Sequence, residues 1–301
     1  EVVEKIAILF RNEGGDLSGR ATDGGDIFID IYTAGLFASF TKPISNSIYS
    51  IGETIAFMSE SSASGTHDIS LNGSSLKTGS GTTISHSLSA STAGNYEATL
   101  SVDDGSITAT DTVNFVVNSA VNSEVLPVGI NLGINYTSDT SITLALYAPF
   151  KEYVYVLGDF NDWKVNINYS MNRDPDNATW WITITGLQAG QKYAFQYLVD
   201  GVTKIADPYS ELVLDPNNDK WINEATYPDP HPYPDGKTAG YATLIELGKI
   251  PYVWEVTNFD APEENNLVVY ELLVRDFLEA HNYTTLLDTL AYLEALGINA
   301  I

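Results

Sequence analysis

The alternation of apolar and polar positions is most informative in residues 267–301. Residues 267–274 are apolar and β-branched, interrupted only by Glu271, as is typical of a strand buried on both faces of a parallel sheet. Leucines then recur at helical spacing in residues 286–296, after two threonines suited to capping a helix. Residues 298–301 resume an apolar run. The pattern predicts a strand, a helix and a strand, which together form one βαβ unit.

A single βαβ unit cannot cover its own apolar faces, because it needs neighbouring strands and helices. We therefore expect residues 266–301 to begin a larger α/β domain and the sequence to be a fragment of a longer protein. The first residue is Glu1 rather than Met, which is consistent with a front end that is also cut.

Shorter strand patterns fill the first part of the chain. Residues 1–40 predict two apolar strands around a loop rich in glycine and aspartate, a trailing hairpin of a truncated β-domain. Residues 41–119 carry short strands every 8–12 residues with turn signals between them, which predicts an antiparallel sandwich. This segment resembles immunoglobulin-like or polycystic-kidney-type modules, with Tyr96 a candidate tyrosine corner. We expect the isolated His67 and His86 in loops or on the surface rather than on a metal.

A second sandwich is predicted for residues 123–225. Its strands surround the sequence GDFNDW at 158–163, the pattern YxFxYxVDG at 193–201 and DPY at 207–209. Residues 226–265 are predicted to be an extended linker, because four closely spaced prolines preclude a helix at its start.

These two regions resemble one family. The sequence VVYELLVRDF, the following helix and LGINAI resemble the opening of the catalytic barrel of α-amylase family glycoside hydrolases, particularly pullulanases, isoamylases and branching enzymes. The motifs of residues 123–225 resemble the early-set, glycogen-binding-like sandwich that precedes this barrel. The resemblance implies a mostly β chain: tandem immunoglobulin-like and early-set sandwiches, followed by the first βαβ unit of a truncated (β/α)8 barrel.

The resemblance also suggests a sugar-binding surface. Glycogen-binding relatives use two tryptophans and a lysine, of which Trp163 matches the first tryptophan and Gln196 replaces the lysine. No tryptophan stands at the second position, near Val202. Two roles stay open for this surface, docking against the barrel and glucan binding. Docking is favoured because two of the three residues of the glycogen-binding platform are absent. Trp180 is a further candidate, since it and Trp181 must face opposite sides of a strand.

No catalytic residue is expected in this fragment. Retaining glycosidases need two carboxyl groups about 5–5.5 Å apart, and the resemblance places these acids on later barrel strands. Glu271, Asp276 and Glu279 are therefore interpreted as structural or substrate-rim residues. We predict that the parent protein is a glycoside hydrolase and that this chain alone is inactive.

The amino-acid composition limits the classes of partner that the chain is expected to bind. Acidic residues number 39 against 14 basic ones, and the net charge of −25 disfavours nucleic acid and anionic membranes. No apolar window is long enough to span a membrane. The absence of cysteine excludes disulfides and is compatible with a bacterial exported protein, so an extracellular or cell-envelope location is expected.

No cofactor or metal site is expected here. The acidic turns at 103–104 and 215–219 could bind Ca²⁺, but such sequences more often form Asx turns. The resemblance places the usual calcium sites in the missing barrel region.

The sequence therefore predicts the N-terminal accessory region of an enzyme that hydrolyses O-glycosyl bonds in starch, glycogen or pullulan. The expected partners are an α-glucan polysaccharide and the catalytic barrel, through intramolecular docking. Two alternatives stay open: a non-catalytic carbohydrate-binding or adhesion protein made of tandem β-modules, and an α-glucan branching transferase.

Overall fold

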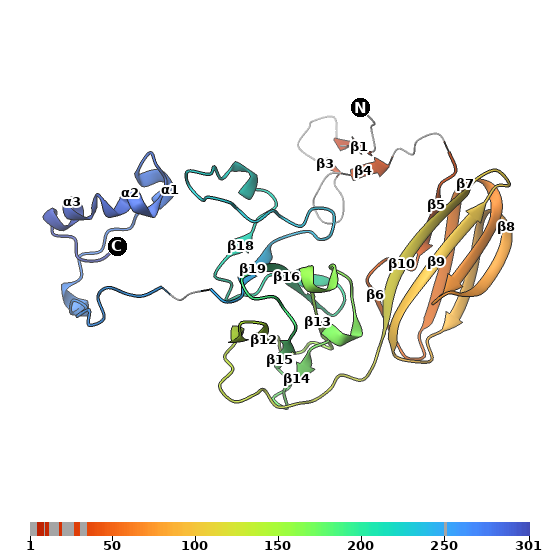
Figure 1. Cartoon of the computed structure of the whole chain (residues 1–301), viewed down its shortest axis with the longest axis horizontal. Helices are drawn as coiled ribbons and strands as arrows, with labels where there is room; N and C mark the ends of the chain where they lie inside the picture. The colour runs from red at the N-terminus through yellow and green to blue at the C-terminus, as the bar shows by residue number, and fades with distance from the viewer. Residues whose placement is uncertain (1–4, 9, 12–17, 20–26, 31–34, 250–251) are drawn as a thin grey trace. The chain divides into compact units, whose positions relative to one another are not determined.

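The computed structural model describes residues 5–8, 10–11, 18–19, 27–30, 35–249 and 252–301, and these residues are mostly β. Contacts divide the chain into two units (Figure 1). The first unit contains residues 1–120 with 165–167, and the second contains 121–164 with 168–301.

Two short antiparallel pairs begin the first unit. Strand β1 (Lys5–Ile8) pairs with β4 (Ile27–Asp30), and β2 (Phe10–Arg11) pairs with β3 (Ser18–Gly19). The first pairing agrees with the predicted hairpin. The rest of the loop between these strands lies outside the described residues.

A six-stranded sheet forms most of the first unit. Its strand order is β5-β7-β9-β10-β6, with β8 paired to β7, and only β6 runs parallel to its neighbour. Buried apolar side chains of these strands, such as Phe57, Leu100 and Phe115, form one core cluster. The strands are β5 (Ala38–Lys42), β6 (Ser47–Ser50), β7 (Thr54–Leu71), β8 (Ser74–Ser89), β9 (Gly94–Asp103) and β10 (Thr108–Asn118).

Two of these strands are longer than the sequence pattern predicts. The pattern predicts short strands, whereas β7 runs through residues 62–67 without a break and is 18 residues long. The register of β7 against β8 shifts between Glu60 and Gly65, so the strand pairs with β5 before the shift and with β9 after it. A Cβ on Gly65 would lie 2.7 Å from the Asp103 carbonyl oxygen, so only glycine allows this approach.

Tyr96 confirms the predicted tyrosine corner. Its hydroxyl donates a hydrogen bond to the Thr92 carbonyl over 2.8 Å, and its ring stacks on Phe115 with 5.4 Å between centroids.

The prediction of a loop or surface position was wrong for His67. His67 is fully buried on β7, where Nδ1 lies 2.9 Å from Ser59 Oγ and Nε2 lies 3.1 Å from the Gly81 carbonyl oxygen. These small neighbours leave room for the ring and satisfy both of its nitrogens, so burial costs little. His86 is half-buried on β8, not in a loop.

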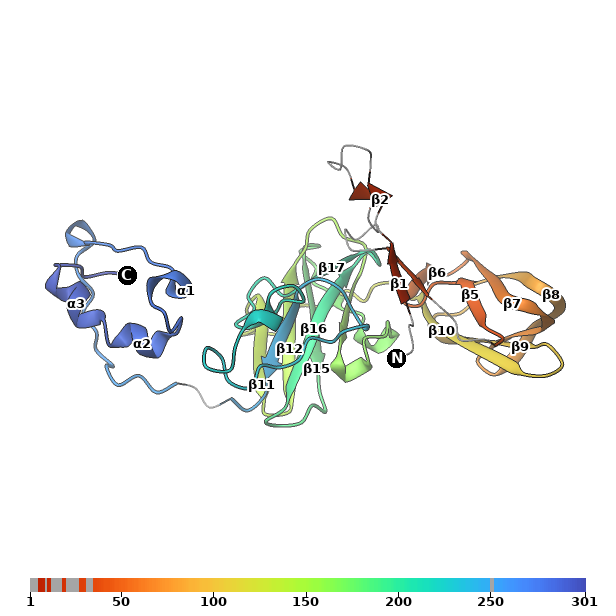
Figure 2. The same cartoon turned by 90° about the horizontal axis from the view of Figure 1, so that it is seen from above.

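The second unit contains a two-sheet module, residues 133–246 (Figure 2). One sheet has the order β11-β12-β15-β14, and the other has β13-β16-β19-β18 with β17 paired to β16. Side chains from both sheets, including Leu144, Val156, Trp180 and Phe195, share one buried core cluster. The strands are β11 (Gly133–Ser138), β12 (Ser141–Tyr147), β13 (Val154–Gly158), β14 (Asn172–Arg173), β15 (Thr179–Ile184), β16 (Lys192–Val199), β17 (Thr203–Ile205), β18 (Val213–Leu214) and β19 (Ala242–Glu246).

Strand β19 corrects the predicted linker. Residues 226–265 were expected to be extended throughout, but β19 pairs with both β16 and β18. The sequence ATLIEL at 242–247 buries Leu244, Ile245 and Leu247, which explains why it joins the core after the prolines end.

Residues 252–301 contain only short helices and one bridge. The expected strands at 267–274 and 298–301 are represented by a single parallel bridge between Val269 and Ala300. Val269 is 65% exposed, and no further strand among the described residues pairs with it. Burial on both faces was expected within a larger domain, and it stays a prediction. The helices are α1 (Val274–Phe277), α2 (Tyr283–Leu287) and α3 (Leu290–Ala295).

The predicted helix is interrupted after Leu287. Its N-cap is Asn282, whose side chain accepts the Thr285 N–H, rather than a threonine. Within the part of the chain that the structure describes, no helix has both the length and the apolar character needed to cross a membrane.

The remaining short helices are 3-10 turns, namely η1 (Asp159–Asn161), η2 (Ile167–Tyr169), η3 (Asp219–Trp221) and η4 (Glu264–Asn266).

Candidate functional site

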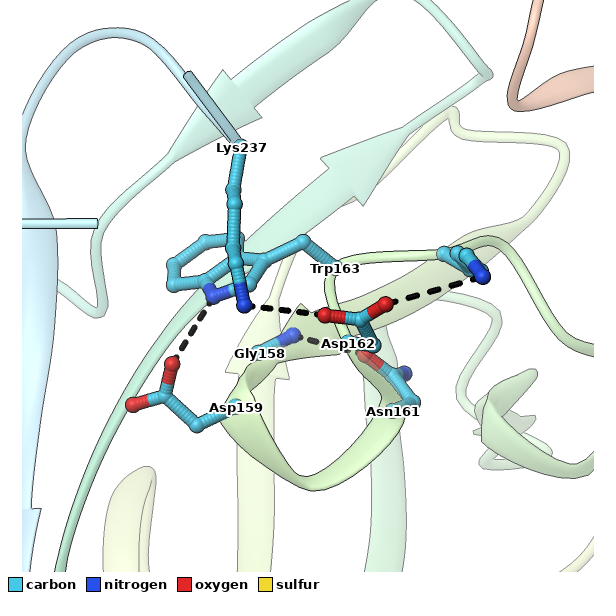
Figure 3. A network of polar contacts seen from close by, with 7 residues as sticks. Gly158, Asp159, Asn161, Asp162, Trp163 and Lys237 are labelled. Atoms are coloured by element: carbon cyan, nitrogen blue, oxygen red, sulfur yellow. Dashed lines mark hydrogen bonds and ion pairs between the residues drawn. The ribbon is translucent and has the colours of Figure 1, made fainter. Parts of the chain in front are cut away.

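The GDFNDW sequence forms a tight turn after β13, held by its own side chains (Figure 3). Asn161 Oδ1 accepts the Gly158 N–H over 2.9 Å, and Asn161 Nδ2 donates to the Val156 carbonyl over 2.8 Å. A Cβ at position 158 would lie 2.6 Å from the Ala194 carbonyl oxygen, so the turn requires glycine. The motif is thus explained by local structure.

The Asp159 carboxylate fixes the Trp163 indole. Asp159 Oδ1 accepts the Trp163 Nε1–H over 2.9 Å (Figure 3). Asp159 Oδ2 accepts the Ala194 N–H over 2.7 Å. One carboxylate therefore ties the ring to strand β16. Trp163 is only 2% exposed, so its ring does not offer a free face to a ligand.

Gln196 is fully buried on β16 and bonded to the chain that follows the prolines. Its Nε2 donates to the Ala239 carbonyl over 2.9 Å and to the Tyr241 carbonyl over 2.6 Å. Thr238 Oγ1 donates to Gln196 Oε1. The amide therefore has partners on both its ends, all from residues 238–241.

Residues 233–241, which we term the covering segment, are held at further points. Lys237 Nζ lies 2.9 Å from Asp162 Oδ1 in an exposed ion pair (Figure 3). The hydrogen bond and charge of Lys237 lower the pKa of Asp162, and Asp162 raises the pKa of Lys237 in return. Lys204 Nζ donates to Thr238 Oγ1 over 3.3 Å, and burial lowers the pKa of Lys204. The covering segment thus closes over Gln196.

Trp180 and Trp181 face opposite sides of β15, as predicted. Trp180 is fully buried in the core and donates its Nε1–H to the Ala148 carbonyl over 2.9 Å. Trp181 is also buried, and its Nε1–H donates to the Glu124 carbonyl over 2.9 Å. Both indoles are therefore structural in this conformation.

The structure does not bring the three candidate residues together on an open surface. Trp163, Trp180 and Gln196 are all buried. Their assignment to sugar binding stays a prediction, which this burial does not favour. The sequence reasoning missed the roles of Asp159 and Lys237. The only signal was indirect: Asp159 lies inside the GDFNDW motif, and Lys237 follows the last proline of the run.

The acidic turns behave as Asx turns. Asp104 Oδ1 accepts the N–H groups of Ser106 and Ile107, and Asp215 Oδ1 accepts that of Asn217. In the described ranges, no three His, Asp or Glu side chains gather so that they could hold a metal ion. The calcium expectation concerned residues outside this sequence and stays a prediction.

Asp276, one of the carboxylates near the end of the chain, forms an ion pair with its neighbour. Asp276 is exposed and lies 2.9 Å from the guanidinium of its neighbour Arg275, whose hydrogen bond lowers the Asp276 pKa. This lowered pKa is opposite in direction to the shift that a general acid needs.

Comparison with known protein families finds a match within the two-sheet module. Residues 131–218 match the family model of carbohydrate-binding module 48, the isoamylase N-terminal domain. The chain contains a domain of this family. The resemblance to the N-terminal region of α-amylase family enzymes is thereby confirmed. The carbohydrate-binding module 48 match ends before the covering segment and β19, although β19 pairs with β16 inside it.

Curated relatives agree with this assignment. A 1,4-alpha-glucan branching enzyme of Clostridium perfringens is 31% identical over 72 residues, which are 23% of this chain and 11% of the relative. A malto-oligosyltrehalose trehalohydrolase of Saccharolobus solfataricus is 25% identical over 167 residues, which are 54% of this chain and 23% of the relative. The chain thus spans less than a quarter of the length of these relatives.

A pullulanase from group B Streptococcus is a similar solved structure. It is 13% identical, the match covers 86% of this chain and 35% of the pullulanase, and the TM-score is 0.35. That score is too low to establish a shared overall fold.

Proposed function

We propose that the chain is the N-terminal accessory region of an α-glucan-active enzyme of the α-amylase family. The observation that carries the proposal is the match of residues 131–218 to carbohydrate-binding module 48. Two curated relatives are named as a 1,4-alpha-glucan branching enzyme and a malto-oligosyltrehalose trehalohydrolase, which supports the same substrate class. The high negative charge suits a neutral polysaccharide better than an anionic partner.

The chemistry of the parent enzyme is proposed to be retaining glycoside hydrolysis. One carboxylate attacks the sugar and forms a covalent glycosyl-enzyme, and a second protonates the leaving oxygen and then activates water. We place both carboxylates on barrel strands outside this sequence. The exposed apolar side chains of residues 267–273 are proposed to pack against these strands, in an enzyme located outside the cell or in its envelope.

A transferase is the second candidate. The relatives that match with 31% and 34% identity are named 1,4-alpha-glucan branching enzymes, which favours transfer to a sugar hydroxyl. The two reactions share the glycosyl-enzyme and differ only in the acceptor, water or sugar.

The proposal is tested by enzyme assays on two proteins, residues 1–301 and the full product of the gene that encodes them. Each is incubated with soluble starch, glycogen and pullulan, and reducing ends are measured alongside the shift in iodine absorbance that branching produces. We expect activity from the full gene product and none from residues 1–301. No activity from the full gene product would contradict the enzyme assignment, and turnover by residues 1–301 would contradict the placement of the catalytic carboxylates.

A further inference from the structure

A cleft opens at the edge of the two-sheet module, away from the residues that the resemblance suggested. It lies between Tyr136 on β11, the terminal strand of one sheet, and Glu246 at the end of β19 in the other sheet. Tyr136 is 45% exposed, and its hydroxyl makes a hydrogen bond with the backbone of Glu246. Tyr227 adds a second exposed ring to the same hollow.

Charged side chains of both signs surround these rings. Lys192 on β16 stands directly opposite Glu246 on β19, so their side chains share one face of the sheet. Lys249 Nζ lies 3.5 Å from Glu211 Oε2 across the mouth. A third carboxylate, Asp139, lines the neighbouring cavity, so two ammonium groups and three carboxylates leave a net charge of −1. This near balance disfavours an anion and suits a neutral polar ligand.

The size of the cleft suits a short chain of sugar rings. A cavity of about 220 Å³ and a neighbouring one of about 480 Å³ share Tyr136, Glu211, Glu246 and Lys249 among their lining residues. Together they fall in the range of roughly 300–1,000 Å³ that is typical of ligand sites, with aromatic walls and a few polar groups.

We propose that this cleft is the site at which the module binds α-glucan, through the Tyr136 ring and the polar groups of Glu246 and Lys192. The apolar face of a glucose ring stacks on the phenol, while the carboxylate accepts hydrogen bonds from sugar hydroxyls and the ammonium donates to them. This inference rests on the proposed function for its ligand. The closure of Gln196 under the covering segment supports it, because the surface suggested by the resemblance is occupied by the chain itself.

The test measures maltoheptaose binding to the 301-residue chain by calorimetry. We compare wild type with Tyr136→Ala and Glu246→Gln, and use Tyr147→Ala and Glu152→Gln as matched exposed controls. We expect each cleft variant to bind at least about tenfold more weakly and each control to bind as wild type does. Thermal unfolding of every variant verifies that the module is folded.

Nuclear magnetic resonance of the unchanged chain provides a second measurement that does not depend on variants. Maltoheptaose should shift the amide signals of Tyr136, Lys192 and Glu246 and leave the Trp163 indole signal in place. Two results would contradict the proposal that the cleft binds α-glucan: binding that leaves the cleft signals unmoved, and binding that both cleft variants retain. Neither result would affect the enzyme assignment. Absence of binding by wild type would also contradict the proposal that the cleft binds α-glucan, and the assays on the full gene product would still decide the enzyme assignment.

Discussion

At the scale of single residues, buried polar side chains with hydrogen-bond partners constrain the fold of the module most strongly. Asp207, the first residue of the DPY motif, is 3% exposed and accepts hydrogen bonds from the Tyr197 hydroxyl over 2.6 Å and the Tyr209 N–H over 2.7 Å. Burial raises the pKa of Asp207 above its ordinary value, and the two hydrogen bonds oppose that shift. The Tyr197 pKa is also raised, chiefly by burial.

Tyr197→Phe should therefore destabilise the module in a pH-dependent way. The variant leaves the buried carboxylate short of a donor, which should cost about 1–3 kcal/mol at pH 7. The pKa of Asp207 is higher in the folded protein than in the unfolded chain. The protonated carboxyl therefore stabilises the fold fully below the unfolded-state pKa, and this stabilisation is lost as the pH rises through the folded-state pKa. The variant raises that folded pKa further, so its deficit should be largest at neutral pH and shrink toward pH 4.

Urea unfolding followed by tryptophan fluorescence measures this deficit. All five tryptophans lie between Trp163 and Trp254, so the signal reports the second unit alone. Tyr147→Phe at an exposed position is the control. An equal deficit at pH 7 and pH 4 would show that the carboxylate is not the group responsible.

Some residue roles could be predicted from the sequence and others could not. Tyr96 was predictable because a tyrosine corner depends on a local contact, four residues back along the chain. His67 was not, because its partners include Gly81, fourteen residues away on another strand. Trp163 was identified as important, but its burial depends on Asp159 and on packing that the motif does not encode.

At the scale of elements, the covering segment is the least expected feature. The prolines correctly exclude a helix at 228–234, although turns and bends occupy 224–229 and 235–237. Nothing in the local pattern indicates that residues 238–241 supply the partners of Gln196. Strand β19 was missed because the linker prediction extended the proline rule past Pro234, the last proline of the run. The strand lengths of β7 were missed because Gly65 suggests a turn, whereas here it allows close packing.

The ion pair between Lys237 and Asp162 should hold the covering segment locally rather than stabilise the fold. Lys237→Ala should speed amide hydrogen exchange in residues 233–241 and leave the urea midpoint unchanged, because exposed pairs contribute little to global stability. High salt should have the same effect on wild type. The pKa of Asp162 is lower in the folded protein than in the unfolded chain. The ion pair with Lys237 is therefore present above the unfolded-state pKa of Asp162 and is lost as the pH falls through its folded-state pKa.

Lys77→Ala, at an exposed position in the first unit, is the control for this experiment. Unchanged exchange in residues 233–241 of the Lys237 variant would mean that the hydrogen bonds to Gln196 hold the segment without the ion pair.

At the scale of the whole molecule, the sequence predicted a mostly β chain, and the structure confirms several antiparallel sheets. The early-set module was recognisable because its motifs mark turns and buried positions that recur in a fixed order. The predicted βαβ unit reduces to one bridge and short helices, because βαβ strands need lateral partners that the described residues do not provide. Two further points stay predictions. One is the division of the chain at residues 40, 119 and 265, and the other is that residues 266–301 begin a (β/α)8 barrel.

The central claim is that this chain recognises α-glucan, and affinity electrophoresis tests it most directly. The 301-residue chain is run in native gels that contain glycogen, hydroxyethyl cellulose or no polysaccharide. The account predicts retardation by glycogen alone, which excess maltoheptaose relieves. Equal mobility in all three gels would contradict it.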